Sequence, residues 1–219
     1  EEWRQQYNLG YKIRNQLAGV RYNNSVYSKR DALGSMDVVR TFKHDELRKF
    51  YQDWYRTDLQ AIGIVGDIDV DLVEKKIKAL FADIPAKTNS KLREYVVIAD
   101  NDKPLYGVAR EKQLQETKVN FEIRFEYKED NSLKQLRELN VINFFNTLIA
   151  NRFKELETKS GQPFTKATIT YGDFVKNYKV FRVTTSVKDA NLLTPALTSV
   201  FTELDRVARF GFTNSEIER

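Results

Sequence analysis

The ten-residue stretch KVNFEIRFEY, residues 118–127, alternates apolar and polar side chains and constrains the fold more than any other segment. Its apolar side chains, two residues apart, are Val119, Phe121, Ile123, Phe125 and Tyr127. A period of two predicts a strand with one buried face and one wet face. Since sheets with one face in water are antiparallel, the stretch predicts a mainly antiparallel sheet.

Helical patterns lie on both sides of this strand. Apolar side chains recur at helical spacing in residues 3–17, 47–55, 73–84, 133–156 and 193–208. The long helix in 133–156 is predicted to begin after Ser132 as N-cap. Its predicted buried face includes Leu133, Leu136, Val141, Phe144, Phe145, Leu148, Phe153 and Leu156. The segment after residue 17 is predicted as a polar loop.

Further short strands are predicted at residues 61–65, 95–98, 105–110, 164–171 and 178–187. Strands and helices mix without regular strand-helix-strand alternation. The fold class is therefore predicted as α+β, with helices layered on a mainly antiparallel sheet.

The segment PAKTNSK, Pro85 to Lys91, has the composition of a linker, with a proline after a helix and then small polar residues. It predicts two units, residues 1–88 and 92–219. The sequence opens in helical pattern without a cap, and Thr213 and Glu216 form a capping-box pattern near its end. We therefore expect this chain to be a piece of a longer protein.

Composition excludes several classes of function. The net charge of +5 comes from 36 basic and 31 acidic residues that are well mixed, without the basic stripe of a nucleic-acid binder. Cysteine is absent, which excludes disulfides and thiolate metal sites. No apolar run approaches the roughly 20 residues of a membrane span.

The segment GIVGDIDVD, residues 63–71, was considered as a ligand site. Gly63 and Gly66 lack the third glycine of a dinucleotide fingerprint. Asp67, Asp69 and Asp71 alternate as in a calcium loop, but a lysine occupies the twelfth position, where that loop needs glutamate. We interpret the segment as a turn followed by a helix that Asp69 caps.

Other polar residues also have structural explanations. His44 is the single histidine, in the first turn of a predicted helix, and is expected to be exposed. Arg152 is expected to form a surface ion pair, with Glu155 three residues later on the same helix. Glu1 and Glu2 are favourable with the helix dipole. Taken alone, these patterns indicate an α+β fragment without a self-contained active site.

Four stretches in order nevertheless resemble the insulinase/pitrilysin-type zinc metallopeptidases, whose motif is H-x-x-E-H. They are EEWR at the start, FYQDWYRTDLQAIGIVGDIDVDLVEKKIKALFADIP from residue 50, LIANRFKELETKSGQPFTKATITY from residue 148, and the final GFTNSEIER. The resemblance spans nearly the whole chain and implies that the Gly66-Asp67 turn is scaffold.

In this family, zinc is held by the two histidines of the motif and a distant glutamate, and the motif glutamate acts as base. The resemblance places the distant glutamate at Glu2, with Glu1 as the alternative if the register differs by one. With one histidine, the sequence cannot contain the motif, which the resemblance places upstream. We therefore expect no catalytic residue in this chain, and expect the chain alone to be metal-free and inactive; substrate-binding residues stay unassigned.

The resemblance implies that residues 1–88 complete a zinc-bearing unit and that residues 92–219 form a related, non-catalytic unit. Expected partners are peptide substrates and the remaining units of the same protein. Two alternatives stay open: a non-catalytic homologue that pairs with an active peptidase, and an unrelated α+β binding module. Family habit favours a bacterial periplasm or cell envelope, with cytoplasm as the other compartment.

Overall fold

The computed structural model describes residues 1–31, 33–88 and 90–218. Asn89, within the predicted linker, lies outside the described residues. Contacts divide the chain into two compact units, Glu1–Ala109 and Arg110–Arg219. The architecture is α+β, as predicted.

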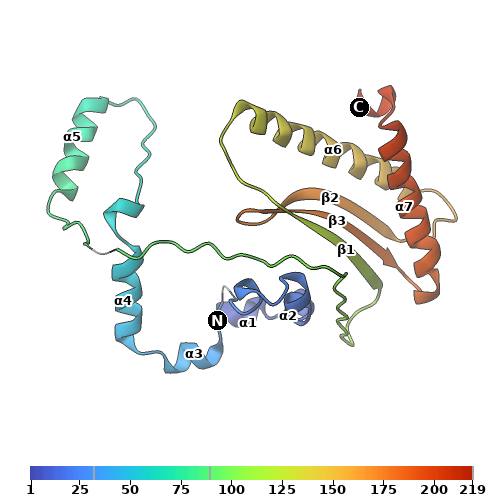
Figure 1. Ribbon diagram of the computed structural model, residues 1–219, viewed down its shortest axis with the longest axis horizontal. Helices are drawn as coiled ribbons and strands as arrows, with labels where there is room; N and C mark the ends of the chain where they lie inside the picture. Colours follow the sequence, from blue (N-terminus) through green and yellow to red (C-terminus); the bar gives the residue numbers. More distant parts are fainter. Residues whose placement is uncertain (32, 89, 219) are drawn as a thin grey trace. The chain divides into compact units, whose positions relative to one another are not determined.

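The first unit is helical where it is regular (Figure 1). Its α-helices are α1 (Glu2–Gln6), α2 (Leu9–Arg21), α3 (Met36–Thr41), α4 (His44–Trp54) and α5 (Val70–Phe81). Short 3₁₀ turns occupy Val26–Ser28 and Thr57–Leu59.

The start of the first unit differs from the single helix predicted there. Asn8 interrupts the helical run, and its side chain accepts a hydrogen bond from the Tyr11 amide at 3.0 Å. Asparagine favours this N-cap position because its side-chain oxygen pairs an amide that the helix leaves unbonded. The segment predicted as a polar loop also contains the last turn of α2 and the first two residues of α3, which Ser35 caps.

The capping role predicted for Asp69 is confirmed, since its carboxylate accepts a hydrogen bond from the Leu72 amide at 3.0 Å. The apolar face predicted for α4 is correct in spacing but is not buried. Its exposed members are Leu47, Phe50, Tyr51 and Tyr55. Helical periodicity reports which side chains share a face, whereas burial requires a partner surface.

The strands predicted at 61–65, 95–98 and 105–110 are wrong for this structure, in which all three segments lack regular secondary structure. A strand exists through hydrogen bonds to a neighbouring strand, and no described residue pairs with these segments. Ile62, Ile64 and Val65 are correspondingly exposed.

The second unit contains the three-stranded antiparallel sheet, in the order β1-β3-β2. The strands are β1 (Thr117–Glu126), β2 (Lys166–Val175) and β3 (Tyr178–Val187), which confirms the positions of three predicted strands. The buried apolar face predicted for the first strand is wrong: Phe121, Ile123 and Phe125 are exposed, because the buried core takes its strand residues from β2 and β3. The central residue Val183 pairs with Phe121 on β1 and with Ile169 on β2.

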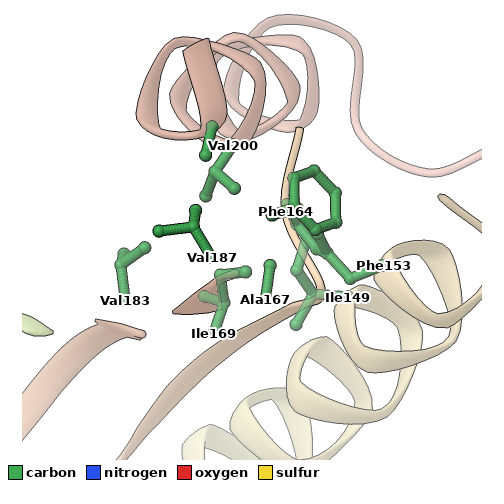
Figure 2. Close-up of a cluster of buried hydrophobic side chains, with 9 residues drawn as sticks. Ile149, Phe153, Phe164, Ala167, Ile169, Val183, Val187 and Val200 are labelled. Carbon is green, nitrogen blue, oxygen red and sulfur yellow. The ribbon is translucent and has the colours of Figure 1, made fainter. Parts of the chain in front are cut away.

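Helices α6 (Leu133–Glu157) and α7 (Leu193–Phe210) contribute to one core with the same face of this sheet (Figure 1). Figure 2 shows this core, in which Phe153, Phe164 and Val200 pack with the strand residues. Its buried members are Ile149, Phe153, Phe164, Ala167, Ile169, Val183, Val187, Ala196 and Val200. Apolar burial from four elements is the main force that assembles this unit.

The predicted cap of α6 is confirmed, because the Ser132 hydroxyl accepts a hydrogen bond from the Gln135 amide at 3.1 Å. Its predicted buried face is only partly correct: Phe153 is buried, but Leu133, Leu136, Val141 and Phe144 are exposed. The C-terminal half of α6 packs on the sheet, and Gly211 ends α7 with a φ of 69° before the short helix α8 (Asn214–Ile217).

Candidate functional site

Glu2, the predicted metal ligand, is the first residue of α1 and is exposed. Its Oε1 atom accepts a hydrogen bond from Nε2 of Gln6 at 3.2 Å. The two residues are four positions apart, so they lie on the same face of the helix. Among the described residues, the Glu2 carboxylate accepts its hydrogen bond from this neutral amide, and the carboxylate forms no ion pair.

A row of aromatic rings continues from α1 into α2. The rings of Trp3 and Tyr7 are stacked with centroids 4.5 Å apart, and the Tyr7 and Tyr11 centroids are 5.4 Å apart. Tyr11 is buried, and its hydroxyl hydrogen-bonds to the Asp31 carboxylate. This bond raises the pKa of Tyr11 and lowers the pKa of Asp31. The aromatic row therefore anchors the helix turn that carries Glu2 and Gln6.

Glu1 occupies the N-cap position of α1, and its side chain makes no capping hydrogen bond. The neighbouring carboxylates therefore differ: the Glu2 carboxylate accepts a hydrogen bond from Gln6, whereas the Glu1 side chain does not cap the helix.

We tested whether the described residues can hold zinc. A catalytic zinc needs three protein ligands, each an imidazole, a thiolate or a carboxylate. Within the part of the chain that the structure describes, no three such side chains gather. His44 is exposed at the start of α4, as expected. The Glu2 carboxylate is of a chemical type that zinc accepts, but residues 1–31, 33–88 and 90–218 do not bring three such ligands together.

In the segment with alternating aspartates, the structure bears out the predicted helix cap. Asp69 caps α5, and Asp67 and Asp71 join no metal-binding group among the described residues. Carboxylates on an exposed turn are stable without a cation because water solvates them.

Arg152 on α6 was expected to form a surface ion pair, and this expectation is wrong. Its side chain is 13% exposed, and it bridges Glu216 on α8 and Glu203 on α7. Its guanidinium also lies 4.9 Å from the centre of the Phe212 ring. The hydrogen bonds from Arg152 and from Thr213 lower the pKa of Glu216 to about 2. This cluster joins three helices and leaves little of Arg152 accessible to a ligand.

A second ionic cluster in the first unit was not predicted. Asp53 is buried near the end of α4 and accepts a hydrogen bond from Lys87 Nζ at 2.6 Å, and Lys91 Nζ lies 3.3 Å away. The hydrogen bond from Lys87 is the main reason that the pKa of Asp53 is lowered. Because the partners are 34 and 38 residues apart, no local pattern could have revealed it. The cluster fastens the segment after α5 to the end of α4.

None of the helices described in the structure combines the length and the hydropathy that crossing a bilayer requires. This agrees with the absence of a long apolar run in the sequence.

Comparison with known proteins gives similarity along the whole chain. The chain is 25% identical over 231 aligned positions to the probable zinc protease PqqL of Escherichia coli, and the alignment covers 100% of this chain and 23% of that protein. The chain thus spans less than a quarter of this relative's length.

Two solved structures share the fold. The first half of the periplasmic protease PqqL from Escherichia coli matches with a TM-score of 0.73 and 20% identity, over 98% of this chain and 46% of that chain. A mutant of the ferredoxin protease FusC in complex with Arabidopsis ferredoxin matches with a TM-score of 0.75 and 20% identity, over 99% of this chain and 24% of that chain.

The family comparison decides the classification. The sequence model described as the peptidase M16 inactive domain matches residues 41–219, which is most of the chain. This chain belongs to the peptidase M16 inactive-domain family.

Proposed function

We propose that this chain is part of a zinc-dependent endopeptidase that acts on peptides, in which it supplies scaffold and one zinc ligand. The observation that carries the proposal is the family match over residues 41–219, together with full-length similarity to a protein named as a probable zinc protease. Glu2 lies before the matched residues, where the chain still aligns with that relative.

In this proposal, Glu2 is one of three protein ligands, and the other two belong to an H-x-x-E-H helix in another part of the full-length protein. A bound zinc ion supplies Lewis acidity and an activated water. The contribution of this chain is a carboxylate held by α1, with one oxygen hydrogen-bonded to Gln6. An anionic ligand of this kind is one that zinc accepts.

The second unit acts as a wall of the chamber that encloses the peptide. Its sheet has a polar face opposite the core, on which Arg182 Nε bonds to Glu122 Oε1 at 2.6 Å and Thr184 bonds to Asn120 at 2.8 Å. Because these polar groups are paired with one another across strands, the face is stable in contact with water. A peptide that adds to a sheet edge is bound through main-chain hydrogen bonds, which suits substrates of varied sequence.

We further propose a bacterial periplasmic location. The support is that one structural relative, PqqL of Escherichia coli, is a periplasmic protease. Fusion of the full-length protein to a reporter that is active only in the periplasm tests this assignment: an active reporter is expected, and a fusion protein that is made but inactive as a reporter contradicts it.

The experiment that tests the zinc-ligand role compares two neighbouring carboxylates in the full-length protein. Glu2→Gln is expected to lower bound zinc to well under one ion per chain and to abolish hydrolysis of a fluorogenic peptide. Glu1→Gln, the matched control, is expected to retain both. If Glu1→Gln loses zinc and Glu2→Gln keeps it, the register is shifted by one and the assignment to Glu2 is wrong.

A second candidate function is a non-catalytic homologous subunit that pairs with an active peptidase. The description of the matched family as an inactive domain favours it. The two functions differ in one measurement: a purified full-length protein that binds no zinc, and that increases peptide hydrolysis only when an active homologue is added, is the subunit.

A further inference from the structure

Resting on the proposed role of Glu2 as a zinc ligand, we propose that Gln6 is a positioning residue for that ligand. Its side-chain amide donates to one carboxylate oxygen of Glu2, which restrains the carboxylate and leaves the other oxygen for the metal. Residues that hydrogen-bond to metal ligands fix the orientation of the ligand before the metal arrives.

The geometry of α1 restrains the Glu2 side chain. Gln6 Nε2 lies 3.2 Å from Glu2 Oε1, within the same helix and one turn further on. A glutamate side chain at a helix start is otherwise free to rotate about three bonds, and each immobilised rotamer-rich side chain costs entropy when it binds. The amide reduces that cost because the carboxylate is already restrained in the metal-free protein.

The Gln6 side chain restrains the Glu2 carboxylate without neutralising its charge. Glutamine donates through a neutral amide, whereas lysine or arginine would bring a positive charge to the carboxylate. Among the residues that the structure describes, no cation forms an ion pair with Glu2. The carboxylate therefore keeps its negative charge available for a divalent cation while its orientation is restrained.

The row of aromatic rings stabilises the short helix on which Glu2 and Gln6 lie. Helix α1 has five residues, so its own hydrogen bonds hold it weakly. Trp3 lies between Glu2 and Gln6 in sequence and stacks on Tyr7, which in turn contacts the buried Tyr11. These contacts hold the turn in helical form, and helical form is what places Gln6 beside Glu2.

The test measures Zn²⁺ affinity of the metal-free full-length protein by competition with a chromogenic chelator. Gln6→Met keeps the length and helix preference of the side chain but removes the donor. It is expected to weaken Zn²⁺ binding about tenfold, the lower end of the usual effect for such partners. Gln5→Met, the same change one residue earlier, is expected to change affinity less than about twofold.

Two further readouts separate positioning from folding. The melting temperature of the metal-free protein is expected to be the same for Gln6→Met and Gln5→Met. The visible absorption bands of the Co²⁺-substituted protein are expected to change in Gln6→Met only, because they report the geometry of the ligands around the metal.

The outcomes distinguish this inference from the proposed function. If Glu2→Gln loses Zn²⁺ and Gln6→Met binds it as tightly as the wild type, the positioning role is wrong and the ligand role stands. Equal weakening in Gln5→Met and Gln6→Met also overturns the positioning role, since the cause is then the helix as a whole. If Glu2→Gln binds Zn²⁺ normally, the ligand role itself is wrong.

Discussion

Arg152 and Glu216 form a two-pronged ion pair in which Nε donates to Oε1 and Nη2 donates to Oε2, both at 2.6 Å. The residues are 64 positions apart, so the pair joins α6 to the start of α8. The same Glu216 carboxylate accepts the Thr213 amide at 2.8 Å and so completes the capping box. One carboxylate thus fixes both the beginning of α8 and its attachment to the core.

Replacing Glu216 with glutamine is expected to destabilise the chain by about 2 kcal/mol, in the range for hydrogen bonds to charged groups. Arg152 is then left with Glu203 as its charged partner in a mostly buried position. The measurement is urea unfolding followed by circular dichroism at neutral pH. Glu218→Gln, in the same terminal segment but exposed, is expected to stay within about 0.5 kcal/mol of the wild type.

The contribution of Glu216 should depend on pH in a defined direction. Its folded-state pKa of about 2 lies below the ordinary value of 4.5, so its stabilisation is present above the ordinary value and is lost as pH falls towards 2. The difference in unfolding free energy between wild type and Glu216→Gln is expected to be constant above about pH 5.5 and to shrink between about pH 4.5 and pH 2.5. A difference that stays constant throughout contradicts the ion pair.

Two phenylalanines on α6 provide a matched test of the core. Phe153 is 1% exposed and Phe144 is 70% exposed. Phe153→Ala is expected to lower the free energy of unfolding by about 3–5 kcal/mol, because it removes a buried ring and leaves a cavity. Phe144→Ala is expected to change it by less than about 0.5 kcal/mol. Equal losses would mean that the exposed half of α6 is packed in solution.

The Asp53 cluster should protect the segment after α5 from proteolysis. Asp53→Ala removes the partner of Lys87 and Lys91, and trypsin cleavage after these lysines is expected to accelerate about fivefold because local opening becomes easier. The control is Asp83→Ala, an exposed carboxylate near the same segment. The cluster is not a restraint if both variants are cleaved at the wild-type rate.

Sequence patterns predicted the positions of the helices and strands of the second unit well, because the signals for these elements are local. Strict alternation located β1, and the hydroxyl of Ser132 marked the start of α6. The capping pattern from Thr213 to Glu216 is present as predicted. Such signals act within a few residues and therefore need no knowledge of the tertiary fold.

The wrongly predicted strands and the misjudged environment of Arg152 have a physical cause in common, because each depended on a distant partner. Residues 61–65 have the composition of a buried strand, but a strand requires a neighbour with which to pair. The partners of Arg152 lie 51 and 64 residues away. The Gln6–Glu2 bond, in contrast, was accessible from helical spacing alone, since residues four apart share a face.

Glu2 is proposed to be the zinc ligand that this chain supplies. Anomalous diffraction at the zinc absorption edge, from crystals of the full-length protein, tests this role most directly. One strong peak is expected at roughly 2.0–2.2 Å from a carboxylate oxygen of Glu2. The ligand role of Glu2 would be contradicted by a zinc peak beside Glu1 or beside residues away from α1, or by the absence of a peak in zinc-supplemented crystals.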